Sequence, residues 1–152
     1  MKRMLVGGLL ALLSAGAMHG RPVEAAGSCE ALAAVALPNT TVTAAQMVEA
    51  GAFRPPNQAN ASRAFAALAA FCRVTATLAP SSDSDIKVEV WLPATNWNGK
   101  FQAVGNGAFN GTIAYPALAA ALARGYAAAS TDTGHVGGSA RFALGHPEKV
   151  ID

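Results

Sequence analysis

Two runs of alternating residues are the feature that most constrains the fold of this chain. From Cys72 to Leu78 and from Ile86 to Leu92, apolar side chains occupy every second position, which is the period of a half-buried β-strand. Residues 80–85 between them read Pro-Ser-Ser-Asp-Ser-Asp, a composition typical of a turn. The two runs therefore predict an antiparallel hairpin, and Pro93 ends its second strand.

The residues after the hairpin predict a strand–loop–helix–strand unit. A short, mostly apolar strand at 100–104 meets a glycine-rich loop at 105–111. A helix is expected at 117–124, stopped by Gly125 as its C-terminal cap. Residues 126–130 then read as a small apolar strand of the kind buried in a parallel sheet. This order predicts the α/β class, with the antiparallel hairpin leading into a parallel sheet.

Both ends of the remaining chain carry weaker signals. Residues 28–51 are alanine-rich, with Ser28 expected to cap a short helix and residues 38–41 to form a turn. Residues 147–152 read as the start of another helix. Because a parallel sheet of two or three strands leaves an exposed edge, we expect the sheet to be incomplete and the natural gene product to continue.

Residues 1–25 have the pattern of a secretory signal. Lys2 and Arg3 precede an apolar run of 14 residues, and small residues around Ala25 predict cleavage there, with Ala26 as the alternative. A membrane anchor is disfavoured because 14 helical residues span only about 21 Å, against a hydrocarbon core of roughly 30 Å. The sequence therefore predicts a secreted or periplasmic protein that is free of the membrane once the signal is removed.

Charge and cysteine content bound the partners and the compartment. Removal of the signal leaves eight basic and eight acidic side chains, which argues against nucleic acid or anionic lipid as a partner. Cys29 and Cys72, 43 residues apart, match no zinc spacing, and an even pair in an exported chain favours a disulfide. Two buried free thiols are the alternative.

The glycine-rich loop is the first candidate for chemistry. Gly105 and Gly107 begin a G-x-G pattern, but Asn110 occupies the place of the third glycine of a dinucleotide loop. Neither the expected downstream acidic residue nor a Lys-Ser/Thr pair follows. Backbone N–H groups after a strand can instead stabilise an oxyanion. A tight turn with glycine at positive φ is the alternative.

The second candidate is the polar segment at the end of the last predicted strand, an edge where α/β sheets place ligands. Asp132 and His135 could form an acid–base pair with Ser130 or Thr131. The alternative is structural, with Asp132 capping a turn and His135 ordering the loop.

Two other polar residues are poor candidates. Ser139 lies in Gly-Gly-Ser-Ala-Arg, where Arg141 replaces the last glycine of G-x-S-x-G and no strand precedes the motif. His146 is beside Pro147 without an evident partner, so a solvent-facing position at a helix start is expected. The two histidines and scattered carboxylates form no metal-binding signature.

Several strings, taken together and in order, resemble the amino-terminal part of the tannase and feruloyl esterase family, which includes mono(2-hydroxyethyl) terephthalate hydrolase-like esterases. They extend from Cys29 through essentially all of the mature chain, and the most specific are Trp97-Asn98-Gly99-Lys100-Phe101, Gly105 to Gly111, and Ser130-Thr131-Asp132-Thr133-Gly134-His135.

The resemblance implies the amino-terminal portion of an α/β-hydrolase fold in residues 26–152. The family's nucleophile elbow, its remaining Ser-His-Asp triad and its lid domain with a calcium site lie downstream of this segment. The residues that carry over are Gly107 in the oxyanion loop and Ala108 as its backbone N–H donor, at a place where the family more often has glycine. Asp132 and His135 are expected to support the site, and the family's first disulfide matches Cys29 and Cys72.

The family also implies a function. It predicts a carboxylic ester hydrolase that cleaves small phenolic or aromatic esters through an acyl-enzyme. No nucleophile, metal or cofactor is expected in this chain, so the chain alone is expected to be inactive. A non-catalytic secreted binding or structural module left by truncation is the alternative.

Overall fold

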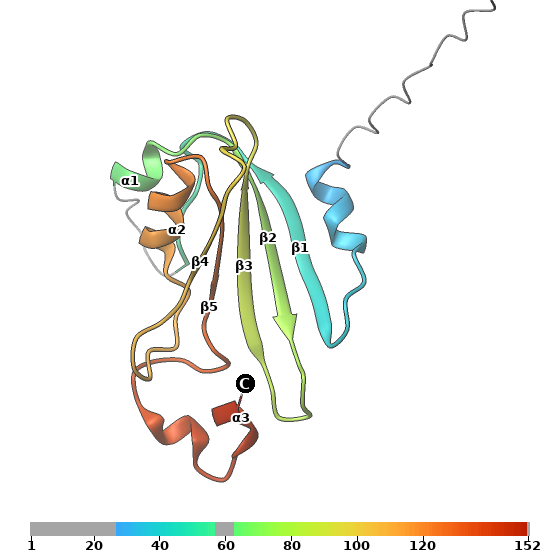
Figure 1. The fold of residues 1–152 in the computed structure, drawn as a ribbon, viewed down its shortest axis with the longest axis vertical. Coiled ribbons are helices and arrows are strands. Elements are labelled where there is room, and N and C mark those ends of the chain that lie inside the picture. Colours follow the sequence, from blue (N-terminus) through green and yellow to red (C-terminus); the bar gives the residue numbers. More distant parts are fainter. Residues whose placement is uncertain (1–26, 57–62, 152) are drawn as a thin grey trace, which may run out of the picture.

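The computed structural model describes residues 27–56 and 63–151. The predicted signal at 1–25 and both cleavage positions lie outside the described residues. A single five-stranded sheet has the order β1-β2-β3-β5-β4, and Figure 1 shows α1 and α2 together on one side of it. The strands are β1 (Thr40–Val48), β2 (Phe71–Leu78), β3 (Ile86–Pro93), β4 (Phe101–Val104) and β5 (Ala127–Thr131).

The helices are short. Two of them are single-turn or two-turn 3₁₀ segments, and α2 is the longest described helix. They are η1 (Cys29–Ala34), α1 (Arg63–Ala66), α2 (Tyr115–Leu122), η2 (Ala140–Ala143) and α3 (Glu148–Ile151).

The predicted mixed sheet is confirmed. β2 and β3 pair antiparallel over their whole length, from Phe71 opposite Pro93 to Leu78 opposite Ile86. β5 then pairs antiparallel with β3 and parallel with β4. The β2–β3 hairpin therefore leads into the parallel pair of β4 and β5. This is the order that the alternating runs and the strand–loop–helix–strand unit after them predict.

The structure adds a strand that the sequence did not predict. The turn expected at 38–41 occupies only Pro38 and Asn39, and β1 begins at Thr40. β1 pairs antiparallel with β2, and its register shifts between Val42 and Ala44. This irregularity moves later side chains to the other face, so no regular alternation marks the strand in the sequence.

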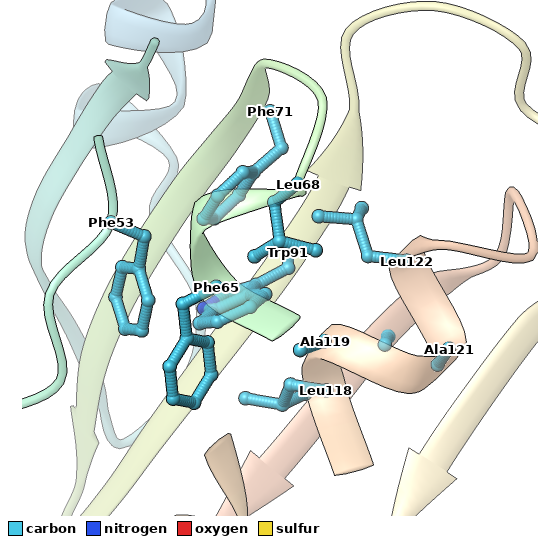
Figure 2. Close-up of a cluster of buried hydrophobic side chains, with 10 residues drawn as sticks. Phe53, Phe65, Leu68, Phe71, Trp91, Leu118, Ala119, Ala121 and Leu122 are labelled. Carbon is cyan, nitrogen blue, oxygen red and sulfur yellow. The ribbon is translucent and has the colours of Figure 1, made fainter. Parts of the chain in front are cut away.

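The core lies between the sheet and the helices α1 and α2 (Figure 2). Its centre is Trp91 of β3, which is fully buried, with the Phe53 ring 4.6 Å away between centroids. α2 contributes Leu118, which is also fully buried. The remaining buried members of this cluster are Phe65, Leu68, Phe71, Ala119, Ala121, Leu122 and Ala128. This packing fixes α2 against the sheet and therefore fixes the loop that precedes α2.

The other face of the sheet carries η1. Ser28 caps this helix, since its hydroxyl oxygen accepts a hydrogen bond of 3.3 Å from the Ala31 N–H. The predicted disulfide between Cys29 and Cys72 is present, with a Cα–Cα distance of 5.6 Å. It joins η1 to β2, so the amino-terminal segment is covalently attached to the second strand of the sheet.

Candidate functional site

The glycine-rich loop connects the carboxyl end of β4 to α2. A hydrogen bond of 3.1 Å from the Asn110 N–H to the Gly107 carbonyl closes a turn with Ala108 and Phe109 at its centre. Ala108 has φ of 50°, so the positive φ that the alternative interpretation assigned to a glycine falls on an alanine. Within residues 27–56 and 63–151, the Ala108 N–H donates to no acceptor of the chain. Ala108 is an exposed residue just beyond the end of β4, and its N–H is free of acceptors among the described residues.

This loop is attached to the segment that follows β5. The Asn106 side-chain amide donates to the Thr131 carbonyl at 2.7 Å. Gly111 and Gly137 exchange two backbone hydrogen bonds, of 2.8 and 3.2 Å. A Cβ atom on Gly111 would lie 2.3 Å from the His135 carbonyl oxygen, so only glycine fits there. Two loops far apart in sequence thus form one unit.

Asp132 has a structural position in this unit. Its Oδ1 atom accepts hydrogen bonds of 2.9 Å from the N–H of Lys87 at the start of β3 and from the N–H of Gly134. Thr133 between them has φ of 57°, which is uncommon for a β-branched residue. Asp132 therefore caps the turn after β5 and ties it to β3.

His135 contacts the glycine-rich loop. Its Nε2 atom lies 3.0 Å from the Phe109 carbonyl oxygen, and its ring stacks on Phe142 with centroids 3.8 Å apart. Among the described residues, the His135 ring makes no hydrogen bond to the Asp132 carboxylate. The geometry corresponds to the alternative interpretation, in which these two residues order loops and form no acid–base pair. Their supporting role in a catalytic site stays a prediction.

The two hydroxyl residues of the same segment are also engaged. Ser130 is 3% exposed, and its oxygen accepts a hydrogen bond of 3.0 Å from the Ala114 N–H at the start of α2. Thr131 accepts one of 3.0 Å from the Thr133 N–H. α2 begins two residues before the predicted position and ends at Leu122, with Gly125 at φ 77° beyond it. Ser130 therefore fixes the helix start that the sequence placed too late.

Ser139 and His146 both make structural contacts. The Ser139 oxygen accepts a hydrogen bond from the Arg141 N–H and caps η2, with no strand leading into it. His146 does have a partner, because its Nδ1 atom is 2.6 Å from Asp83 Oδ2 in the β2–β3 turn. The sequence carries no signal for this contact, since 63 residues separate the two.

Sequence reasoning also missed a buried polar network beneath α2. The Glu89 carboxylate, 5% exposed, is paired with the Arg73 guanidinium through two hydrogen bonds. It also accepts from Trp91 Nε1 at 3.0 Å and from the Tyr115 hydroxyl at 2.9 Å. The hydrogen bond to Glu89 raises the pKa of Arg73, and burial raises the pKa of Tyr115, with the Glu89 charge adding to it. The network anchors the first residue of α2 to β2 and β3.

No group of three or more histidine, cysteine or carboxylate side chains in the described part of the chain is arranged to bind a metal ion. The same residues contain no helix of the length and apolar character that a membrane span requires.

Comparison with known proteins places these features in a family. A family model described as tannase and feruloyl esterase matches residues 72–152. An uncharacterized esterase of Xanthomonas campestris is 46% identical over 131 residues, which are 85% of this chain and 22% of that protein. A probable feruloyl esterase B-1 of Neosartorya fischeri is 33% identical over 66% of this chain and 19% of its own length. The chain thus spans about a fifth of the length of these relatives.

Solved structures agree with this match. Feruloyl esterase B from Aspergillus oryzae superposes with a TM-score of 0.70 and 30% identity, over 81% of this chain and 24% of that one. Another esterase from Aspergillus oryzae superposes with a TM-score of 0.69 and 31% identity, over 81% of this chain and 25% of that one. The described residues therefore form the amino-terminal portion of an α/β-hydrolase fold, as the sequence predicts.

Proposed function

Because the chain belongs to the tannase and feruloyl esterase family, we propose that it forms the amino-terminal part of a secreted serine esterase that cleaves esters of phenolic or aromatic acids. The family-level activity is carboxylic ester hydrolysis, since the relatives are named as esterases. In this proposal the chain supplies the oxyanion loop, while polypeptide beyond residue 152 supplies the serine, the rest of the triad and a lid domain with its calcium site.

The free N–H of Ala108 is the observation that carries the proposal. Attack on an ester builds negative charge on the carbonyl oxygen, and fixed N–H donors aimed at that oxygen lower the barrier. Ala108 lies just past the carboxyl end of β4, and within the described residues its N–H has no competing acceptor. The donor therefore does not have to break an intramolecular bond before it can bind the oxyanion.

The free edge of β4 supports the placement of the nucleophile. Among the described strands β4 pairs only with β5. A further parallel strand on its open edge ends beside Ala108, because the carboxyl ends of parallel strands meet at one edge of a sheet. A serine in the turn after that strand reaches the same ester carbonyl as the Ala108 donor.

Substrate class and location rest on two further observations. A relative carries the name feruloyl esterase, which favours phenolic acid esters as substrates. The Cys29–Cys72 disulfide fits an oxidising compartment outside the cytosol, and the predicted signal at 1–25 agrees with export.

The test is hydrolysis by the full-length protein expressed from its whole open reading frame. We expect turnover of a hydroxycinnamate methyl ester, loss of turnover after labelling with a fluorophosphonate, and covalent label on a serine beyond residue 152. A matched aliphatic ester of the same alcohol reports the preference for the aromatic acid.

The isolated 152-residue chain is the control, and we expect no turnover from it beyond that of denatured protein. Two results contradict the proposal. One is ester turnover by the isolated chain that Ser139→Ala abolishes, and the other is a full-length protein that neither turns over esters nor takes the label.

A further inference from the structure

The contact between His135 and the glycine-rich loop joins the turn that carries the free donor to the segment after β5. The Nε2 atom lies 3.0 Å from the Phe109 carbonyl oxygen. A carbonyl oxygen only accepts hydrogen bonds, so this contact is a hydrogen bond when Nε2 carries the hydrogen. Phe109 follows Ala108 directly, and these are the two central residues of the turn. The imidazole therefore contacts the turn at the Phe109 carbonyl, with one peptide group between that carbonyl and the free N–H of Ala108.

The His135 ring is itself held on its other sides. One face stacks on the Phe142 ring at 3.8 Å with only 10° between the planes. Its Nδ1 atom lies 3.2 Å from the carbonyl oxygen and 3.3 Å from the hydroxyl of Thr133. The ring cannot rotate away from Phe109 without losing both sets of contacts.

Thr133, which holds the Nδ1 side, has an unusual backbone of its own. Its φ of 57° carries strain for a β-branched residue, and such strain persists only where the surroundings enforce it. The Thr133 N–H donates to Thr131 Oγ1, and its hydroxyl donates 2.6 Å to the Asp132 carbonyl. Ala108, on the facing loop, is a second non-glycine residue at positive φ. The two strained residues therefore lie in loops that the His135 side chain connects.

We propose that His135 is a positioning residue for the oxyanion turn. Its Nε2–H holds the Phe109 carbonyl and so keeps the Ala108 N–H pointing out of the loop, where a substrate oxygen can reach it. This role rests on the proposed function. It asks only for a hydrogen bond from the ring, whose nitrogens lie against oxygen atoms of Phe109 and Thr133.

The kinetic test uses three variants of the full-length protein. His135→Phe keeps a flat ring for stacking on Phe142 but has no donor, and His135→Gln offers an amide donor in place of Nε2. His146→Gln, at the histidine bonded to Asp83, is the control.

We expect His135→Phe to lower kcat and kcat/KM together by about 10²-fold, the effect of a misplaced donor, with KM changed by less than about twofold. His135→Gln should recover roughly tenfold, the value of one neutral hydrogen bond. The control should match the wild type. Wild-type kcat in folded His135→Phe overturns the proposal, and so does equal loss in the Phe and Gln variants.

A spectroscopic arm separates this inference from the proposed function. In the same full-length protein, nitrogen-15 spectra of His135 should show a protonated Nε2. His135→Phe should shift the Phe109 carbonyl carbon and increase the mobility of the Ala108 amide. A full-length protein that hydrolyses no ester refutes the proposed function, while these signals still decide whether His135 holds the turn. An unprotonated Nε2 or an unchanged Ala108 amide overturns the inference.

Discussion

Replacing Glu89 with glutamine tests the buried network beneath α2. The two carboxylate oxygens each accept two hydrogen bonds, one from Arg73 and one from either Tyr115 or Trp91. Glutamine has the same shape but offers one oxygen and one NH₂ group. Whichever way the amide is oriented, its NH₂ meets a guanidinium donor, and Arg73 loses its counter-charge.

The size of the effect follows from burial. The Glu89 side chain is 6% exposed and the Arg73 side chain 20%. Water therefore replaces few of the hydrogen bonds and little of the charge–charge attraction that Arg73 loses. Removing one partner of a buried ion pair costs about 3–5 kcal/mol of unfolding free energy. Because each kcal/mol lowers Tm by roughly 4 °C in a domain of this size, Glu89→Gln should lower Tm by about 12–20 °C.

Urea unfolding followed by far-ultraviolet circular dichroism measures this loss, and fluorescence gives a second probe because Trp91 is fully buried. Glu49→Gln makes the same chemical change at an exposed side chain and should alter stability by less than about 0.5 kcal/mol. If Glu89→Gln loses less than about 1 kcal/mol relative to this control, with an unchanged m-value, the carboxylate does not bind Arg73 as described.

Three further changes probe other parts of the fold. Replacing Cys29 and Cys72 together by serine should remove about 4 kcal/mol of unfolding free energy, because the disulfide links residues that are 43 positions apart. Thiol titration of the unfolded, unreduced wild type should find no free thiol, and two reactive thiols would contradict the disulfide. Burial raises the pKa of Tyr115, so the phenol loses its proton at a higher pH in the folded state than in the unfolded state. The stabilising contribution of Tyr115 is therefore full below about pH 10 and declines above it. Urea midpoints should fall less steeply with pH in Tyr115→Phe than in the wild type, and identical slopes would refute this. Gly111→Ala places a Cβ atom 2.3 Å from the His135 carbonyl oxygen, whereas Gly138→Ala meets nothing within 4 Å; thermal melting should drop for the first only, and equal Tm values would be inconsistent with the contact.

Local patterns were sufficient for the sheet wherever the strand was regular. The alternation of β2 and β3 predicts which residues share a face and that the two strands pair antiparallel, because side chains in a strand alternate with period two. It does not predict which face is buried, since the face read as polar carries Glu89 and Trp91 and is the one that packs beneath α2. β1 was missed since its irregularity between Val42 and Ala44 breaks that period. The start of α2 was placed two residues late because Ser130, distant in sequence, fixes it through the Ala114 N–H.

The polar contacts were less predictable than the strands. Arg73 and Glu89 are 16 residues apart, and each alone reads as the polar side of a strand. Their pairing follows from register, since Thr75 faces Glu89 and Arg73 faces Trp91 on the same side of the hairpin. The contact of His146 with Asp83 depends on the path of the chain after β5, for which the sequence offers no periodic signal.

The conformation of Ala108 shows why the candidate site is a tertiary property. A single L-residue in the left-handed region costs roughly 1–2 kcal/mol, about what one hydrogen bond contributes, so the turn's own bond from Asn110 to Gly107 barely offsets it. The contacts that add to this bond come from the end of β5 and the segment after it, through Asn106 to Thr131 and through the paired Gly111 and Gly137. The glycine-rich string alone therefore does not fix the free N–H, because the donor's direction is set where the two loops meet.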